Sequence, residues 1–377
     1  MKAAFKHTSH TSCVSRFSLL TAALCALLAA CTSDTETLPA DSDLLQLIPF
    51  VRPTEEMTTR AAVIPDGYQP FTEVYKIPAG NEPLSFGIFM TEEGSTPPDN
   101  MGLITYQGVD GNGIDKWRSY VEVKQKPYYI YGFLPAEAAT GGASVAAYNS
   151  DFANGAELTI QNLPATSKYD VCVITGVQDA TSADAEPDLH LGSFAYQGKT
   201  KGQNYVGVLI DHIFSEIDFK LKVDPEYHAL RRIKLKNLTL KAIGYSTVTV
   251  TVRLVANTTD TNPISSLSWT SPGGTSNAIL FESTEGKEIT TEPTGFGEVR
   301  GFSAPAASNS LSVVCEYDVY DVNGNLVRPD CTAENNLSLK VVSLKRGEKS
   351  VVTITIRPTY LYVLSEPDLD NPTIVLN

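Results

Sequence analysis

A repeated pattern of short strand-like runs limits the fold of this chain more than any other feature. In Glu216–Val223, Ile217, Phe219 and Leu221 alternate with charged residues, which predicts a strand with one buried and one solvated face. Similar runs recur from residue 84 to residue 357, and the breaks between them are rich in Gly, Pro, Asp and Asn. Short strands with such turns, and no long helical pattern, predict an all-β chain built of sandwiches or barrels.

The chain is long enough for two units of this kind. Its 377 residues correspond to about two domains. A Gly- and Lys-rich break, Gln197–Gly202, separates two sets of runs that have similar length and pattern. We therefore expect two consecutive β-sandwich domains, residues 61–205 and residues 206–357.

A further segment, residues 358–377, follows the second set of runs. It contains two strand candidates, Thr359–Leu364 and Thr373–Leu376, on either side of a turn cluster. This segment either completes the second domain or pairs with another molecule, and its residues alone favour the first.

The first 30 residues have the pattern of a secretory leader. Basic residues precede the uncharged run Phe17–Ala30, which has fourteen residues and is too short to span a bilayer as a helix. The run ends in Leu28-Ala29-Ala30-Cys31, the pattern of a bacterial lipoprotein cleavage site. We expect residues 1–30 to be a lipoprotein signal peptide and Cys31 to carry lipid (palmitate), so that the protein is exported. An ordinary leader with an unrelated cysteine is the alternative.

Residues 31–60 read as a polar tether with one apolar run. The run Leu44–Arg52 is apolar enough for a strand but contains Pro49. Because proline cannot donate to a ladder, we expect this run at a sheet edge. Near the end of the tether, the Arg60–Ala61 bond lies in a polar stretch that a trypsin-like protease can reach.

Charge and motifs exclude several classes of function. The first 30 residues hold three basic residues and no acid, so the mature chain has 26 basic against 43 acidic groups, a net charge of −17. Such a surface repels nucleic acid and anionic lipid head groups. The histidines His190, His212 and His228 are isolated in sequence, which argues against zinc. Asp110–Asp115 and Asp321–Asn325 depart from the calcium-loop pattern and are expected to be turns. With no nucleophile elbow or P-loop either, we expect no metal, no cofactor and no enzymatic activity.

Three cysteines, Cys172, Cys315 and Cys331, remain after Cys31. An odd number argues against a disulfide scaffold. Cys315 and Cys331 flank the hairpin signal Asn323-Gly324, but a two-residue loop would place them on opposite faces. Three buried thiols are favoured, with a Cys315–Cys331 bond as the alternative.

The order of these features resembles the fimbrillins, the type V pilus subunits of the Bacteroidales. Five features carry the resemblance: the lipoprotein cysteine, the acidic tether, the apolar run Leu44–Arg52, the Thr-Arg-Ala at residue 60 and the two β-rich halves. Asp211–Phe219 resembles the segment that opens the second fimbrillin domain. Leu344–Arg357 resembles the closing strand of that domain.

The resemblance implies two transthyretin-like β-sandwiches and assembly by donor-strand exchange. In the precursor, Leu45, Leu47 and Val51 would face a groove of the first sandwich, with the pairing broken or bent at Pro49. An arginine-specific protease would cut between Arg60 and Ala61 and release the segment. A C-terminal strand of a neighbouring subunit would replace it, and the candidate side chains in that strand are Tyr360, Tyr362, Ile374 and Leu376.

By this resemblance the chain would be a structural subunit of a fimbrium on the cell outer membrane, with a role in adhesion. Its partners would be other fimbrial subunits, the outer membrane through the lipid, and surface ligands of host or bacterial cells. The role could be that of stalk, tip or basal anchor. The alternative is a permanently anchored glycan-binding lipoprotein with Trp117, Trp269 or the cluster Tyr128–Tyr131 as a sugar platform.

Overall fold

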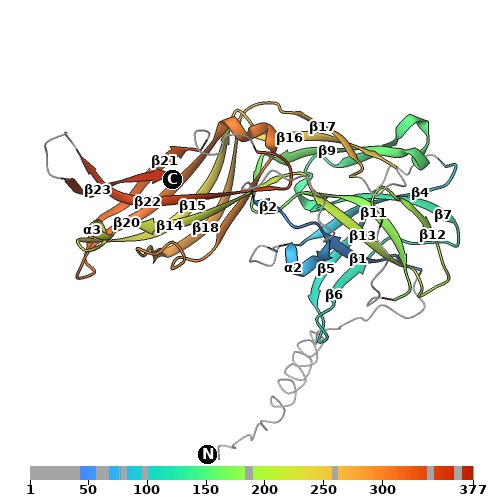
Figure 1. Ribbon diagram of the computed structural model, residues 1–377, viewed down its shortest axis with the longest axis horizontal. Coiled ribbons are helices and arrows are strands. Elements are labelled where there is room, and N and C mark those ends of the chain that lie inside the picture. Colours follow the sequence, from blue (N-terminus) through green and yellow to red (C-terminus); the bar gives the residue numbers. More distant parts are fainter. Residues whose placement is uncertain are drawn as a thin grey trace, which may run out of the picture. The chain divides into compact units, whose positions relative to one another are not determined.

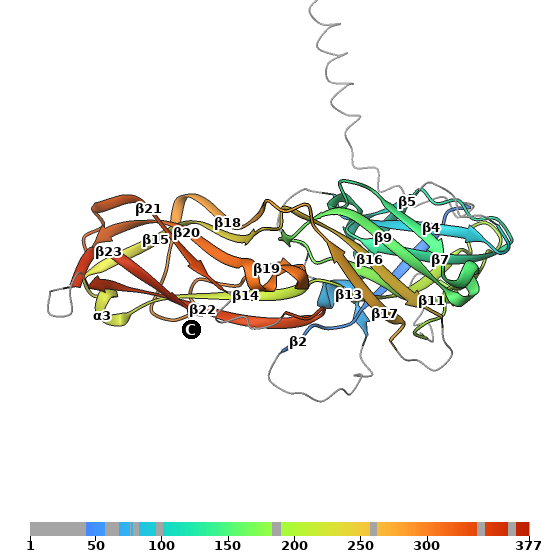
Figure 2. The same cartoon turned by 90° about the horizontal axis from the view of Figure 1, so that it is seen from above.

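The computed structural model describes residues 43–56, 68–75, 77, 83–95, 101–182, 190–256, 262–337, 344–360 and 367–376. Within these ranges the chain forms four β-sheets and only short helices, among them α2 (Phe71–Val74) and α3 (Pro225–His228) (Figures 1 and 2). No helix in these ranges is long and apolar enough to cross a membrane. The all-β prediction is confirmed.

The largest sheet has nine strands and curls around an apolar core. Two hydrogen bonds join the segment just before strand β1 (Gln46–Val51) to the segment just after strand β6 (Asp115–Ser119). Leu45 N donates to Val121 O (2.8 Å), and Val123 N donates to Asp43 O (2.7 Å). The two ends of the sheet therefore meet, and its inner face encloses one hydrophobic cluster. In spatial order the strands are β3 (Gln69–Pro70), β1 (Gln46–Val51), β13 (Tyr205–His212), β11 (Cys172–Ala180), β7 (Pro127–Leu134), β4 (Ser85–Glu92), β5 (Gly102–Val109) and β6 (Asp115–Ser119), with β12 (Ala195–Gln197) beside β7.

A four-stranded sheet packs on the outer face of this curled sheet. Because side chains alternate across a strand, β7 turns Ile130 toward the inner core and turns Tyr131 and Phe133 outward. The outward residues share a cluster with Leu158 and Val250 of the second sheet. Its strands are, in order, β17 (Ile264–Thr270), β16 (Thr247–Val255), β9 (Gly155–Pro164) and β8 (Ala143–Ala147).

The other two sheets form a sandwich around residues of the same cluster. Ile217, Phe219 and Leu221 of β14 are buried, as their alternation predicts, and share the cluster with Leu235 and Val313 of the facing sheet. One sheet has the order β10 (Thr166–Ser167), β19 (Val299–Ser303), β14 (Ser215–Val223), β22 (Glu348–Tyr360) and β2 (Glu55–Glu56), with β23 (Pro367–Leu376) also on β22. The facing sheet has the order β18 (Thr275–Glu288), β15 (Arg231–Ile243), β20 (Leu311–Asp321) and β21 (Leu326–Asn336).

Strands from both sides of residue 205 share three of these sheets, including the one in which β10 pairs with β19 and β2 pairs with β22. The expected boundary after Tyr205 falls inside β13, which pairs with β1 and β11. In the four-stranded sheet β16 pairs with β9, so residues 247–255 lie beside residues 155–164 (Figure 1). The strands thus interleave across the expected boundary, and a division into two sandwich domains stays a prediction.

The three remaining cysteines are free, buried thiols. Two irregularities in the β20–β21 ladder shift its register, so that Cys315 lies opposite Ala333 and Cys331 opposite Tyr317. The two sulfurs are therefore held in different cross-strand pairs. The Cys315–Cys331 disulfide is wrong as an alternative, and three thiols are confirmed.

Candidate functional site: the seat of strand β1

Strand β1 occupies a long slot along β13. The two strands run parallel in continuous register from Gln46 opposite Tyr205 to Val51 opposite Ile210. On its other side β1 meets the two-residue strand β3 only at Phe50 and Val51. The predicted inward residues are indeed buried, with Leu45, Leu47 and Val51 at 0%, 5% and 0% exposure. Thus β1 fills a groove of the curled sheet, and its main support comes from one strand.

Pro49 does not break this pairing, contrary to expectation. The amide of Gln46 donates to the carbonyl of Asn204, just before β13, and the amide of Arg52 donates to the carbonyl of Ile210 on β13. Since amide direction alternates along a strand, the even-numbered residues donate to β13 and the odd-numbered ones point away from it. Pro49 is odd-numbered, so its missing N–H falls on the side opposite β13. Its register partner is Val208, and the ladder continues through it.

An ion pair between a half-buried arginine and a buried aspartate closes the end of the groove. Arg52, directly after β1, places Nε 2.9 Å from Oδ1 of Asp211, with the two side chains 17% and 1% exposed. Tyr68 donates its hydroxyl to the same carboxylate oxygen (3.0 Å) and accepts a hydrogen bond from Arg52 Nη2 (2.9 Å). Burial, followed by the charge of Asp211, raises the pKa of Tyr68, so this hydroxyl stays a donor. We call these three residues, together with His212 and Asp170, whose contacts are described next, the polar clamp.

The histidine of the clamp holds β1 by its main chain. His212 Nε2 donates to the carbonyl of Arg52, and Nδ1 donates to the carboxylate of Asp170. Burial by itself lowers the pKa of His212, but the charge of Asp170 and the hydrogen bond to it outweigh burial and raise the pKa well above its ordinary value. The imidazole is therefore a buried cation that donates from both nitrogens.

Cys172 lies beside this pair. Its Sγ lies 3.5 Å from Nδ1 of His212, and Asp170, Cys172 and His212 are the group of described residues whose donor atoms lie close enough to hold a metal ion. Burial, however, raises the pKa of the thiol to about 12, and both imidazole nitrogens already have protein partners. The arrangement is that of an ion pair with a protonated thiol beside it.

A second set of charges fixes the chain just beyond Arg52. Thr54 donates its hydroxyl to Glu216 Oε2 (2.7 Å), and Lys349 and Arg300 both lie against Glu216 and Asp218, with Lys349 Nζ 2.6 Å from Asp218 Oδ2. The next residues form β2, which pairs parallel with Glu348 and Lys349 of β22. The N-terminal segment is therefore attached at β13, at the clamp and at β22.

The C-terminal segment lies in the sheet of its own chain. Strand β23 pairs antiparallel with β22, from Ile354 opposite Leu376 to Tyr360 opposite Pro367. Ile374 and Leu376, two of the predicted exchange residues, are 6% and 8% exposed. Since β14 occupies the other side of β22, β2 and β23 share a single edge of β22. The segment therefore completes this sheet, as its residues alone favour.

Five predicted positions are only partly placed or not placed. Cys31, Arg60, Ala61 and Tyr362 lie outside the described residues. Tyr360 is the last residue of β22, and its side chain is outside the described set. The lipid attachment and the cleavage bond therefore stay predictions.

The two candidate calcium loops are turns held by their own aspartates. Asp110 Oδ1 accepts hydrogen bonds from the amides of Asn112 and Ile114. Asp321 Oδ1 accepts the equivalent bonds from Asn323 and Asn325. In both loops these bonds to amide groups hold the aspartate, as is usual for such turns.

The proposed sugar platforms are largely core residues. Trp117 is 6% exposed and packs 5.1 Å from the ring of Phe71 and 5.0 Å from that of Tyr106. Tyr131 is fully buried and donates its hydroxyl to Phe152 O. Trp269 is half-buried, with its ring 6.1 Å from that of Phe214.

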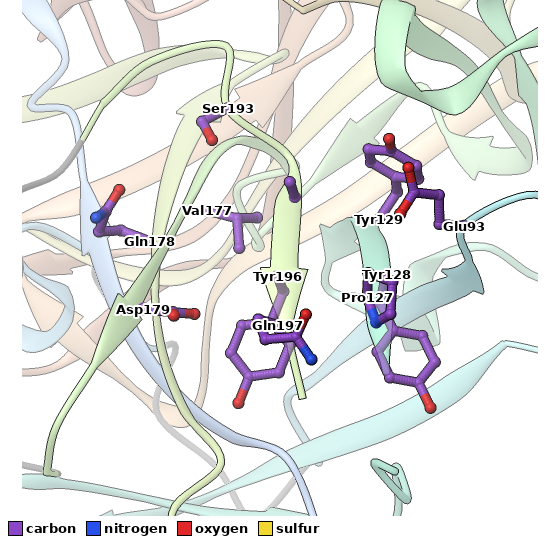
Figure 3. A pocket seen from close by; sticks show the side chains of 11 residues that line it. Glu93, Pro127, Tyr128, Tyr129, Val177, Gln178, Asp179, Ser193, Tyr196 and Gln197 are labelled. Atoms are coloured by element: carbon purple, nitrogen blue, oxygen red, sulfur yellow. The ribbon is translucent and has the colours of Figure 1, made fainter. Parts of the chain in front are cut away.

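A pocket of about 460 Å³ lies beside the tyrosine cluster, between β7, β11 and β12 (Figure 3). Tyr128 and Tyr196 line it but are only 5% and 2% exposed, and Figure 3 shows both rings pointing away from Glu93 and Tyr129. The Tyr196 hydroxyl donates to Asn204 within the fold. Tyr128 and Tyr196 thus offer a sugar ring little surface for stacking, and the half-buried Tyr129 is the more exposed tyrosine of the lining.

Comparisons with known proteins give structural neighbours only. No protein-family model matches the chain, and no curated protein matches it. Among solved structures, it is similar to a candidate cell adhesion protein from Bacteroides fragilis, with 11% identity, a TM-score of 0.40 and coverage of 89% of this chain and 97% of that one. A candidate cell adhesion protein from Bacteroides uniformis has 13% identity, a TM-score of 0.38 and coverage of 78% and 90%. A fimbrial protein from Bacteroides vulgatus has 14% identity, a TM-score of 0.33 and coverage of 89% and 98%. These superpositions are loose, so the function is argued below from the chain's own residues.

Proposed function

We propose that this protein is a structural, non-catalytic subunit of a cell-surface fimbrium, exported as an outer-membrane lipoprotein through Cys31. The observation that carries the proposal is the seat of β1. An N-terminal strand that pairs along its length with one strand, and that is followed by a cleavable linker, is built as a removable part. The neighbours described as fimbrial or cell adhesion proteins have the same kind of name as the family that the sequence resembles.

In this proposal β1 protects the groove until assembly. Cleavage at Arg60–Ala61 separates β1 and β2 from the rest of the chain, which is then joined to them by non-covalent contacts alone. Loss of β1 exposes the edge of β13 and the apolar slots of Leu45, Leu47 and Val51, and such an edge invites pairing with another strand. A strand from a neighbouring subunit then adds to β13 and fills the slots.

The C-terminal segment of this chain is the candidate donor to a neighbouring subunit, and before donation it lies in its own sheet. It follows the end of β22 at Tyr360, and its residues 367–376 form β23, which pairs antiparallel with β22. Donation to a neighbour therefore requires that Ile374 and Leu376 leave their own sheet. Deleting the segment would expose β22, so truncation tests folding together with assembly.

A peptide competitor avoids that difficulty. The protein is mixed with the other subunits of its fimbrium and treated with an arginine-specific protease, and filament growth is followed by light scattering and electron microscopy with and without a peptide of residues 44–54. We expect the peptide to occupy the groove and to suppress filament growth, whereas a matched peptide with Leu45→Asp and Leu47→Asp has no effect. N-terminal sequencing of the filaments should give Ala61. Filaments that grow equally well in excess peptide would contradict strand exchange, and uncleaved protein in the filaments would contradict the role of Arg60.

A further inference from the structure

We propose that the β1 groove accepts only a strand that carries Arg or Lys directly after its last inward apolar residue, and that its natural occupant is therefore not the C-terminal segment of another copy of this chain. The inference rests on the proposed function and identifies the partner: a strand from a different protein with a cation at the position of Arg52. It is carried by the polar clamp.

The clamp keeps its anion when the N-terminal segment leaves. Asp211 belongs to β13 and is 1% exposed when β1 is in place, and Tyr68 also stays, because it lies after the cleavage bond. Asp211 Oδ2 accepts no hydrogen bond from the described residues. Removing one member of a buried ion pair is strongly unfavourable because the other charge is left desolvated. An occupant without a cation leaves Asp211 in that condition.

Among the described residues outside the clamp, Arg346 is a further cation near Asp211. Arg346 interacts with Asp211 through its charge, but burial lowers the pKa of its guanidinium. Among the described residues, the direct ion pair to Asp211 is made by Arg52. The charge of Arg346 therefore reduces the cost of leaving Asp211 without Arg52, but it does not form the direct ion pair that Arg52 forms.

His212 fixes position but does not select sequence. Its Nε2 donates to a main-chain carbonyl, that of Arg52, and every residue type provides this acceptor. The histidine therefore sets where the occupying strand ends, and Asp211 reads the side chain at that end. Together they define one register, with the selected residue next to the last inward position.

The C-terminal segment of this chain has no cation that could pair with Asp211. Residues 358–377 contain Glu366, Asp368 and Asp370 and no Lys, Arg or His. If Leu376 took the slot of Val51 in the direction of β1, Asn377 would stand at the position of Arg52 and Asp370 in the apolar slot of Leu45. An acidic strand would thus meet a buried carboxylate.

Peptide uptake by the full chain tests the selection. The cleaved protein is unfolded in guanidinium and refolded with fluorescent peptides, and binding is measured by anisotropy. The peptides are residues 44–54, the same with Arg52→Gln, the same with Arg52→Lys, residues 367–377, and residues 367–377 with Asn377→Arg. We expect Arg52→Gln to weaken binding roughly 10- to 100-fold and Arg52→Lys to weaken it much less. Residues 367–377 should bind as weakly as the Arg52→Gln peptide, and Asn377→Arg should improve them.

Protein variants separate the clamp from general effects. With Asp211→Asn, the peptides with Arg52 and with Arg52→Gln should bind equally, because the selecting charge is gone. Glu157→Gln is the matched control, since Glu157 forms an exposed ion pair with Arg253 (2.7 Å) far from β1 in sequence, and it should preserve the full discrimination. If no peptide binds, the proposed exchange fails. If all bind equally, or residues 367–377 bind best, exchange stands and the selection by Asp211 is overturned.

Discussion

The imidazole of His212 ties β1 to the protein through a charge that depends on pH. Its Nδ1 is paired with Asp170 and its Nε2 with the carbonyl of Arg52. Because the folded protein holds the proton more tightly than the unfolded chain, the pKa of His212 is higher in the folded state. Protonation and the docking of β1 are therefore linked.

This linkage predicts how stability changes with pH. The contribution of His212 is fully present below the unfolded pKa of about 6.5 and is lost as pH rises through the higher folded pKa. We expect the free energy of unfolding of the wild-type protein to fall between about pH 6 and pH 8, below the range in which thiols ionise, more steeply than that of His212→Gln. Urea titrations at several pH values measure this. Cys172 contributes only at higher pH, because burial raises its folded pKa to about 12 and its stability contribution is lost only above the unfolded thiol pKa of about 8.5.

His228 provides a control of opposite sign. Burial and the charge of Arg232 lower its pKa, so its contribution to stability is present above about pH 6.5 and is lost as pH falls. His228→Gln should therefore leave the loss on the alkaline side unchanged. An identical alkaline slope in the wild-type protein and in His212→Gln would contradict the linkage.

The sequence identifies the apolar half of the site and misses the polar half. Alternation alone places Leu45, Leu47 and Val51 on one face, because the period of a strand is two. His212 is isolated in sequence, since Asp170 and Cys172 lie 42 and 40 positions away and are brought to it only by the pairing of β11 with β13. Arg52 and Asp211 are ordinary charged residues until the fold buries them together.

At the scale of the element, the direction of each amide in β1 decides which substitutions the groove tolerates. The amides of Gln46 and Arg52 point to β13, and the two-residue period assigns the same direction to Ile48 and Phe50. The sequence shows that Pro49 lacks a donor. It does not show which side faces the partner strand, and this is why the expected break at Pro49 is absent.

Two neighbouring proline substitutions test this argument. Pro49→Ala restores an amide on the side away from β13 and should change the free energy of unfolding by less than about 1 kcal/mol. Ile48→Pro removes an amide that donates to β13 and should cost about 2–3 kcal/mol. Hydrogen exchange on β13 should accelerate only for Ile48→Pro. Equal effects of the two substitutions would show that β1 pairs differently from the register described here.

At the scale of the whole molecule, the strand order couples the two halves of the chain. The sequence predicts the all-β class because short alternating runs persist throughout. It does not predict which runs pair, because pairing depends on contacts between distant segments. Paired residues of β9 and β16 lie about ninety positions apart in the sequence, so no local pattern predicts that these strands are neighbours. The same holds for the parallel pairing of β1 with β13.

This coupling predicts that the first half of the chain does not fold alone. A fragment ending at residue 205 lacks β13, which lies between β1 and β11, and lacks β16, which pairs with β9 over most of its length. Both the groove of β1 and the cover of the outer face are then incomplete, so apolar residues such as Tyr131, Phe133 and Leu158 lose partners in their cluster. We expect this fragment to bind a hydrophobic dye and to unfold without a cooperative transition, whereas co-expression with residues 206–377 restores cooperative unfolding.

A fragment extended to residue 212 separates the two causes. It regains β13 but not β16, so among the strands of the fragment only β11 should recover protection from hydrogen exchange. Cooperative unfolding of the fragment ending at residue 205 would instead establish an independent first domain with the boundary expected from the sequence.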